Sequence, residues 1–327
     1  MVSLFKDRSP IAIIWLFLLC IAVHSGFVFS PPAVLQSDNN GLLSVFLNKF
    51  CLGLSPILLI CIYYVCVLVQ AFWLNAILSN FHMYGRVNYF PAMVYILLTG
   101  VFLEWNNLSP SLLINTLIIG LYAKTLQLYN HPNPKTLIFN MGLLVGIIIL
   151  LYHPLALLII AALFAVMIIR TFNPSEWIVL LLGIATPFYF SFSYLFLFDR
   201  WSSYSDYIPH WQFNLPDVHI NNVFFITVGL LFLVLMIGLY YWQQENRKLL
   251  IQVRKNWGLL ISLFFILLLV PFINKGSSLD SFLLWIVPAS PLIAKGFFVP
   301  SNNRLPNIMF WLLFALILLK NWQIIHS

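Results

Sequence analysis

The sequence has very few charged residues. Only 8% of its 327 residues are Asp, Glu, Lys or Arg, whereas soluble domains contain about a quarter. Hydrophobic residues make up 62% of the chain, and the mean hydropathy is +0.96. Apolar runs recur from Ile11 to Trp322. This composition excludes a soluble globular protein, and it also excludes a soluble body carried by one membrane anchor.

Several motifs with known chemistry are missing. The sequence has no P-loop, no Rossmann glycine pattern, no G-x-S-x-G and no H-E-x-x-H, so ATP-driven transport by this chain alone is not expected. The four cysteines lack C-x-x-C spacing and are interpreted as small hydrophobic residues of helices. No two histidines stand three or four residues apart. A metal site would therefore need histidines from separate helices, namely His24, His153, His210 and His219.

The apolar runs predict an all-α polytopic membrane protein with about eleven transmembrane helices in a single domain, residues 1–327. A helix needs roughly 20 residues to cross about 30 Å of hydrocarbon. The predicted spans are 10–30, 53–79, 89–105, 110–128, 137–152, 154–170, 177–198, 222–243, 257–274, 280–298 and 306–323. The fifth and sixth, which meet at Tyr152-His153-Pro154, are short and could instead form one hairpin of short or tilted helices. The first has no cleavage site close behind it and is interpreted as a retained anchor.

Basic residues predict the orientation. With a cytoplasmic N-terminus, only Lys49, Arg200, Lys275 and Lys320, four of the 16 Lys and Arg residues, fall outside, as the positive-inside rule requires. The net charge of +7 therefore needs no nucleic-acid partner. Six acids fall on the outer side or at the outer ends of spans: Asp38, Glu104, Asp199, Asp206, Asp217 and Asp280. Lys124 and Lys295 lie near inner ends of spans, where their side chains are expected to reach for the interface.

The first outer loop, FSPPAVLQSDNNGLLSVFLNKF, combines an acid with a short amphipathic run. Pro31-Pro32 ends the first span. One of the polar residues Ser37, Asp38 and Asn39 is expected to cap an interfacial helix with an apolar body from Leu42 to Phe50. Asp38 is either only a helix cap or a functional carboxylate.

Other candidate site residues lie at the outer ends of spans. Glu104 precedes two asparagines, and an ionisable group near hydrocarbon suggests function, although the adjacent Trp105 also fits a hydrated interface position. The seventh span ends at Asp199 and Arg200. Either the two side chains form an ion pair with each other, or Arg200 binds a phosphate. Further cations for a phosphate are Lys49 and Lys275. The long outer loop 199–221, which contains His210, is either a lid or an aromatic interfacial loop.

The order of these elements resembles the seven-span core of GT-C glycosyltransferases, over about residues 1–221, with four further spans in 222–327. Members of that superfamily use lipid-linked sugar donors, and a carboxylate of the first outer loop is their catalytic base; Asp38 matches it. The stretches NYFPAMVYILLTG, YNHPNPKTLIFNMG, TFNPSEW and GIATPFYF resemble a family of multipass inner-membrane proteins from Bacteroidota that has no established activity. The resemblance implies a bacterial inner-membrane location.

Three functions follow as hypotheses. The first is a transferase that uses a polyprenyl-phosphate-linked sugar on the outer face. In this transferase Asp38 is the catalytic base. The acceptor is oriented, or a divalent cation is held, by Glu104 or Asp199. The phosphate is neutralised by Arg200, Lys275 or Lys49, and His210 is a further substrate contact. The second is a non-catalytic subunit or scaffold of an envelope or secretion assembly with membrane-protein partners. The third is a membrane oxygenase that requires the four outer histidines to converge.

Overall fold

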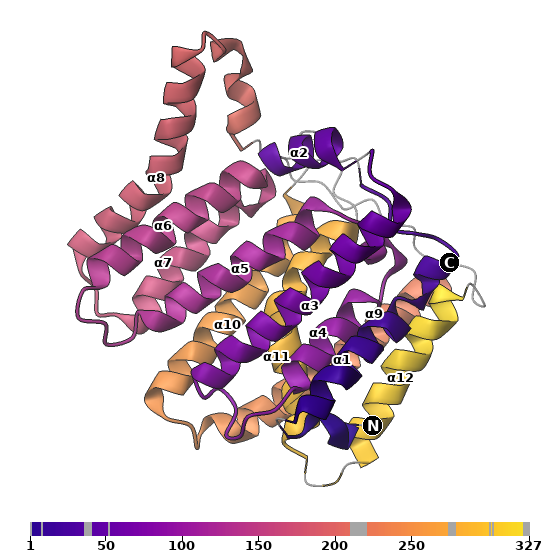
Figure 1. Cartoon of the computed structure of the whole chain (residues 1–327). Helices are drawn as coiled ribbons and strands as arrows, with labels where there is room; N and C mark the ends of the chain where they lie inside the picture. The colour runs from indigo at the N-terminus through magenta and orange to yellow at the C-terminus, as the bar shows by residue number, and fades with distance from the viewer. Residues whose placement is uncertain are drawn as a thin grey trace.

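The structure is a computed structural model that describes residues 2–7, 9–35, 41–51, 53–209, 221–273, 279–300, 302 and 304–322. Over these residues it is built from helices alone, apart from an isolated bridge between Val34 and Leu108. The predicted all-α class is therefore confirmed. Figure 1 shows the helices gathered in one bundle, from which the end of α8 projects.

Twelve α-helices lie in the described part of the chain. They are α1 (Pro10–Val23), α2 (Leu42–Phe50), α3 (Pro56–Asn80), α4 (Phe90–Thr99), α5 (Pro110–Gln127), α6 (Pro134–Leu151), α7 (Leu158–Ile169), α8 (Pro174–Leu197), α9 (Asn222–Asn246), α10 (Ile251–Leu269), α11 (Ile286–Phe298) and α12 (Arg304–Asn321). The 3-10 helices are η1 (Val2–Phe5), η2 (Ser25–Val28), η3 (Leu103–Asn106), η4 (His153–Leu157), η5 (Trp201–Tyr207), η6 (Val270–Phe272) and η7 (Leu279–Trp285). Proline is the first or second residue of six α-helices, namely α1, α3, α4, α5, α6 and α8. Its fixed φ favours the first turn of a helix, and its missing N–H costs nothing there. In α12 the proline, Pro306, is the third residue.

Seven helical segments are long and apolar enough to cross a membrane: Pro56–Asn80, Pro134–Leu151, Pro174–Leu197, Asn222–Asn246, Ile251–Phe272, Leu279–Phe298 and Arg304–Asn321. The apolar helices Pro10–Val23, Phe90–Thr99 and His153–Ile169 are shorter. Together with α5, these segments overlap all eleven spans expected from the sequence. Length and composition thus qualify seven of them as membrane-spanning, and the chain has the character of a multi-pass membrane protein.

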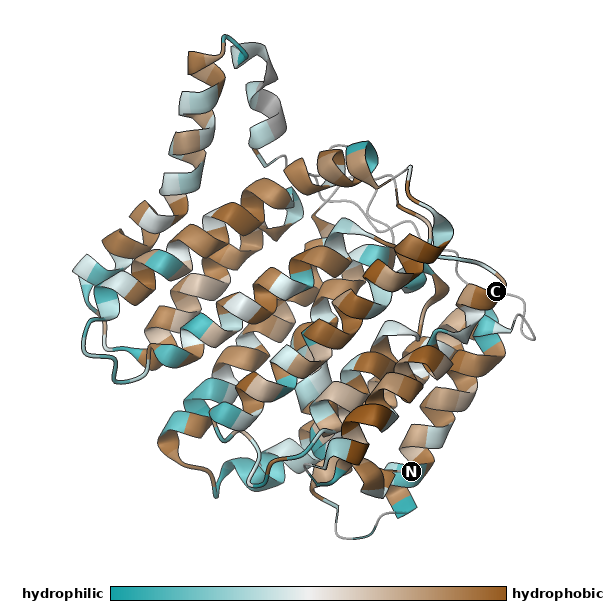
Figure 2. Ribbon diagram, in the orientation of Figure 1, coloured by the Kyte–Doolittle hydropathy of each residue, from teal (hydrophilic) through white to brown (hydrophobic). Residues whose placement is uncertain are grey.

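The centre of the bundle is formed by α11 and α4. In the segment Leu279–Phe298, 89% of the residues are buried, against 22% of the most apolar stretch of α8 and of α9. All ten residues of α4 are buried as well, and α11 packs against α4, α9, α10 and α5. Figure 2 shows hydrophobic residues along the outward faces of the peripheral helices too, as expected where helices meet lipid.

Two of the buried segments are irregular for part of their length. The chain leaves α4 at Gly100 and continues through η3, and η7 precedes α11 without a break. Segments η3 and η7 contact each other. Non-helical backbone at membrane depth persists only where protein or a polar cavity surrounds it. Nearly all of η7 is buried, and so are Trp105 and Asn106 of η3.

Glycine allows α6 and α8 to pack closely. A Cβ at Gly183 would lie 2.5 Å from the backbone oxygen of Phe139 and 3.1 Å from the Cα of Gly142. One turn further on, Gly146 faces Ile184 and Pro187, so the two helices run parallel. Gly142 and Gly146 are spaced as in the small-residue motifs that bring membrane helices together.

We expect Gly183→Leu to destabilise the protein because the new side chain must displace backbone of α6. The loss should be about 1–3 kcal/mol or more, the usual effect of overpacking. Gly229→Leu on α9 is the matched control, since a Cβ there meets nothing within 4 Å. Thermal unfolding of the detergent-solubilised protein measures both. Equal melting temperatures for the two variants would contradict the close contact.

At the end of the bundle opposite Asp280, which we call the Lys295 end, a buried ion pair joins α11 to α9. The ammonium of Lys295 lies 2.6 Å from Glu245 Oε2, and its side chain is fully buried. The ring centroids of Tyr84, Trp257 and Phe298 lie 4.8, 5.1 and 5.6 Å from Nζ. The expectation that Lys295 reaches for the interface is therefore wrong: an aromatic cage and a carboxylate hold it inside.

Tyr84 contributes to this cage from the loop between α3 and α4. Burial, together with the neighbouring Tyr122 and Glu245, raises the pKa of Tyr84 well above its usual range. The phenol therefore remains protonated, and it donates a hydrogen bond of 2.6 Å to the backbone oxygen of Pro291.

Removing the two partners of the ion pair should have unequal effects. Glu245→Gln leaves a fully buried ammonium without its counter-charge, which costs about 3–5 kcal/mol when one partner of a buried pair is removed. Lys295→Met leaves a carboxylate whose side chain is 30% exposed and can be hydrated, so its effect should be clearly smaller. Chemical denaturation of both variants measures the difference. A larger loss for Lys295→Met would show that the cage, and not the charge pair, stabilises this end.

Candidate functional site

Four 3-10 segments meet at the other end of the bundle, which we call the Asp280 end. Segment η7 contacts both η3 and η6, and η6 contacts η4. These segments begin at positions 103, 153, 270 and 279 of the chain. Their convergence brings polar side chains of α5, η4 and η7 into the interior of an apolar bundle.

Asp280 is the carboxylate of this cluster. It is 7% exposed, and the hydroxyl of Ser111 donates a hydrogen bond of 3.4 Å to its Oδ2. The hydroxyls of Tyr152 and Ser281 lie 3.1 Å apart, and the Tyr152 phenol is close enough to Asp280 to feel its charge. We call Ser111, Tyr152, Asp280 and Ser281 the Asp280 cluster. Chemically it is a buried carboxylate surrounded by hydroxyl groups that can pass or orient a proton.

Hydrogen bonds from neighbouring helices fix the position of η7. The indole Nε1 of Trp105 donates to the backbone oxygen of Leu279 at 2.7 Å, and Asn115 Nδ2 donates to that of Leu283 at 3.2 Å. Both side chains are buried. Because they bind on either side of Asp280 along the chain, its carboxylate is held in a defined place.

Asp38, the proposed base, lies outside the described residues, but its loop ends at this cluster. Gly41 has φ +126°, and a Cβ there would lie 2.5 Å from the backbone oxygen of Leu151 and 3.0 Å from the amide nitrogen of Tyr152. The loop therefore returns to the bundle directly beside Tyr152, three residues after Asp38.

A short helix, α2, is present where the sequence predicted an interfacial helix after this loop. The expected cap is wrong, because Gly41 holds the N-cap position and α2 has no side-chain cap. Its polar residue Ser44 faces inward and donates to the backbone oxygen of Gly41 at 2.7 Å. Leu47 is buried beside Ser44, whereas Val45 and Phe46 are exposed, so α2 presents apolar side chains both to the bundle and away from it.

Glu104 is exposed in η3, and it interacts electrostatically with Lys320. The Lys320 ammonium is buried, and it donates to the backbone oxygen of Val101 at 3.1 Å and to Thr227 Oγ1 at 3.2 Å. It also lies 4.7 Å from the ring centroid of Phe102. Glu104 acts on this ammonium electrostatically without forming an ion pair within 4 Å.

The remaining sequence candidates do not enter the Asp280 cluster. Lys49 is exposed and lies 5.7 Å from the ring centroid of Phe50. Asp199 and Arg200 are exposed between α8 and η5, and Asp199 has φ +51°. They lie at the tip of the projection in Figure 1. Lys275 and His210 fall outside the described residues.

None of the four residues of the cluster was predicted as a site residue from the sequence, which indicated Asp280 only as an outer acid. The available signal was an acid between hydroxyl and apolar residues in SSLDSFLLW. Its partners could not be found from the sequence, since Ser111 and Tyr152 are more than a hundred residues away along the chain.

No three metal-binding side chains come together among the described residues. His24 is fully buried at the end of α1, with its Nδ1 3.0 Å from the backbone oxygen of Cys20 and its Nε2 3.2 Å from the Tyr63 hydroxyl. His153 lies in η4, and His210 and His219 are outside the described residues. The hypothesis of an oxygenase with four histidines gains no support from this placement.

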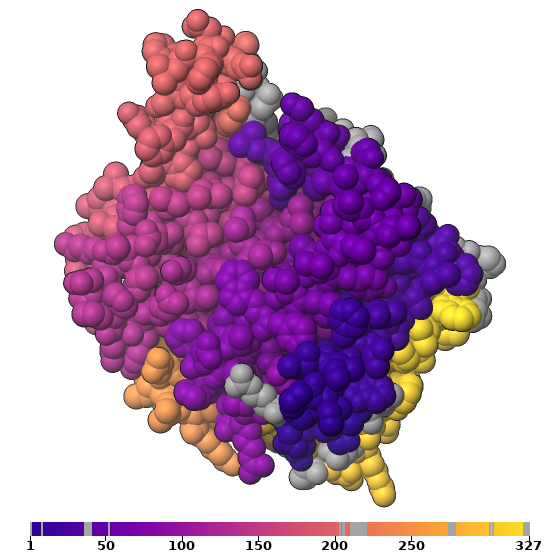
Figure 3. All heavy atoms as spheres, viewed as in Figure 1, coloured from indigo at the N-terminus to yellow at the C-terminus, as the bar shows by residue number. Residues whose placement is uncertain are grey.

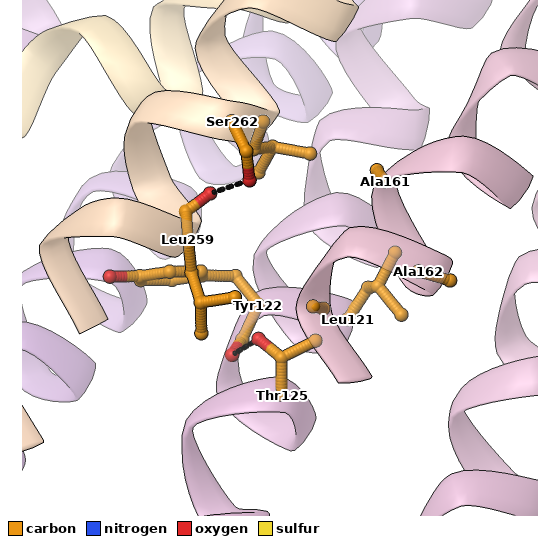
Figure 4. Close-up of a pocket in the computed structure, with 9 residues that line it drawn as sticks. Leu121, Tyr122, Thr125, Ala161, Ala162, Leu259 and Ser262 are labelled. Atoms are coloured by element: carbon orange, nitrogen blue, oxygen red, sulfur yellow. Dashed lines mark hydrogen bonds between the residues drawn. The ribbon is translucent and has the colours of Figure 1, made fainter. Parts of the chain in front are cut away.

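Figure 4 shows a small cavity between α5, α7 and α10. Its volume of about 20 Å³ is enough for a single water molecule. The hydroxyls of Thr125 and Ser262 at its wall donate to carbonyl oxygens of their own helices, at 2.6 and 2.8 Å. A larger groove of about 450 Å³ runs between α1 and α12, lined by Ala22, Ser25, Phe314, Leu318, Leu319 and Trp322. Both are mostly apolar, and neither is lined by a residue of the Asp280 cluster.

No protein-family model matches the chain, and no curated protein or solved structure matches it.

We expect Gly41→Ala to disturb the junction between the Asp38 loop and Tyr152. A Cβ is strained at this φ and collides with the end of α6, so the free energy of unfolding should fall by about 1–3 kcal/mol. Gly53→Ala, where a Cβ meets nothing within 4 Å, is the control. Urea or thermal unfolding in detergent compares them. If Gly41→Ala were as stable as the control, the loop would not be seated beside Tyr152.

Proposed function

We propose that this multi-pass membrane protein is a transferase that moves a sugar from a polyprenyl-phosphate carrier to an acceptor hydroxyl at the Asp280 end. We further propose that it works in the bacterial inner membrane, with this end on the outer face. The observation that carries the proposal is the contact of Gly41 with Leu151 and Tyr152. Because of this contact, the loop with Asp38 and the buried Asp280 cluster belong to the same end of the bundle.

The proposed reaction divides the work between two carboxylates. The acceptor oxygen attacks the anomeric carbon, the bond from that carbon to the carrier phosphate breaks, and Asp38 takes the acceptor proton. Asp280, with the hydroxyls of Tyr152 and Ser281, orients the acceptor. Buried carboxylates positioned in this way change reactivity because the apolar surroundings strengthen their interactions.

The exposed charged residues have the supporting roles expected from the sequence. Glu104 and Asp199 are candidates to orient the acceptor or to hold a divalent cation. Arg200, Lys49 and Lys275 are candidates to neutralise the released phosphate, and His210 is a candidate substrate contact; Lys275 and His210 lie outside the described residues. All the described members of this set are exposed, as groups that meet a substrate from the membrane surface must be.

Substitution of the two carboxylates tests the proposal. Asp38→Asn and Asp280→Asn should each lower glycan transfer by about 10²–10⁴-fold, the usual contribution of a positioned acid or base. Asp7→Asn is the control, since Asp7 is exposed and lies beside η1, near the Lys295 end. The measurement is the amount of surface glycan made by a deletion strain that carries each variant, with protein levels checked in the membrane fraction.

Wild-type glycan levels with Asp38→Asn would exclude Asp38 as the base. If the deletion removed the glycan while both carboxylate variants restored it fully, the protein would act as a non-catalytic subunit of an envelope assembly and not as the transferase.

A further inference from the structure

The end of α8 leaves the bundle. Up to Pro187, α8 packs against α6 through glycine, and beyond it the helix continues to Leu197 and is followed by η5. We call residues 188–207 the α8–η5 hairpin. Figures 1 and 3 show it projecting past the other helices. Since α6 and α8 run parallel, the projection lies at the Asp280 end.

The hairpin exposes many large apolar side chains. Phe196 and Leu197 are 72% and 76% exposed. Exposed as well are Tyr189, Phe190, Tyr194, Phe198, Trp201 and Tyr204. In the described side chains of the hairpin only Leu195 is buried. A hairpin with so little interior is not stable in water, because too little apolar surface is removed from the solvent to offset the entropy of ordering it.

The exposed side chains cover one broad face of the helix. Successive helical residues turn by about 100°, so Tyr189, Phe190, Tyr194, Phe196 and Leu197 spread over roughly 160° of the circumference, with the buried Leu195 on the other side. This face is wider than the stripe of about 100° that a surface helix packs against a protein core, and four of its five residues are aromatic.

Two hydroxyl groups of this part of α8 are bonded within the helix. The hydroxyl of Ser191 donates to the backbone oxygen of Pro187 at 2.9 Å, and that of Thr186 to Leu182 at 2.7 Å. Such internal bonds are what a helix needs where no water is available. The charged residues Asp199 and Arg200 occur at the turn between α8 and η5, where they can reach headgroups.

We propose that the α8–η5 hairpin is embedded in the interfacial layer of the lipid bilayer, and that its partner is lipid. Tyrosine and tryptophan concentrate at this layer because their rings are apolar and their O–H and N–H groups can bond to water or headgroups. The ring of Trp201 contacts those of Phe192 and Tyr204, with centroids 6.2 Å apart in each pair, so aromatic contacts hold η5 against α8 in that layer.

The test places a fluorescent nitrobenzoxadiazole label at single cysteines in lipid nanodiscs. The background carries Cys61→Ala and Cys66→Ala, since the other two cysteines are buried. The probe positions are Phe196→Cys and Tyr189→Cys. Lys248→Cys, exposed between α9 and α10, is the control for water, and Phe232→Cys, 62% exposed within α9, is the control for the hydrocarbon interior.

We expect the probes at 189 and 196 to emit at shorter wavelength than the probe at 248. Nitroxide lipids labelled at the headgroup or at the fifth acyl carbon should quench them most, while the probe at 232 should be quenched most from the twelfth carbon. Water-like emission without quenching at 196 would overturn the proposal. Apolar emission without quenching from any lipid would also overturn it and would indicate a protein partner, with cross-linking of Phe196→Cys between two copies identifying a second copy of this chain.

Discussion

Every backbone polar group inside an apolar bundle must find a partner within the protein, and much of this structure follows from that constraint. Where a helix gives way to a 3-10 segment, carbonyl oxygens lose their regular partners. Polar side chains of other helices supply the missing donors. Tyr63 donates to Trp105 at 2.9 Å, Trp105 to Leu279 at 2.7 Å and Lys320 to Val101 at 3.1 Å. Several of the buried polar residues are therefore partners of irregular backbone.

The same irregular segments build the candidate site. A continuous helix through residues 279–298 would bond its own carbonyl oxygens along its whole length. It would then need no donors from other helices, and polar neighbours would have no carbonyl oxygens to bind. The 3-10 geometry of η7 instead draws Trp105 and Asn115 toward it, and it places Asp280 and Ser281 beside Ser111 and Tyr152. The stability of the irregular backbone and the presence of a buried carboxylate thus have one structural cause.

Hydropathy predicted the class of this fold and the positions of its segments, because insertion into lipid depends on the apolar length of each segment alone. It also predicted α2, whose pattern is local. It did not predict which segments are broken, since the donors that permit η7 come from α5 and η3. For the same reason the interior site was missed: the separation between Ser111 and Asp280 is 169 residues. Lys295 was misjudged because Tyr84 and Trp257 of its cage come from other segments, as does its partner Glu245, and no local pattern reveals these three contacts.

The two ends of the bundle hold their buried cations in different ways. Lys295 has a close carboxylate partner, whereas Lys320 has none within ion-pair distance among the described residues. Lys295 is paired with Glu245 and enclosed by three rings, so its charge is neutralised and its surroundings are complete. Lys320 is held by a carbonyl and a hydroxyl, with Glu104 acting from a greater distance. The ammonium–carboxylate pair at the Lys295 end leaves no electrostatic demand for a ligand. At the Asp280 end, Lys320 and Asp280 belong to different clusters joined through η3, so positive and negative charge remain separated inside one apolar region. The proposed phosphate-linked substrate would meet groups of both signs there, and for this reason we place the proposed chemistry at the irregular end of the bundle and not at the tightly paired one.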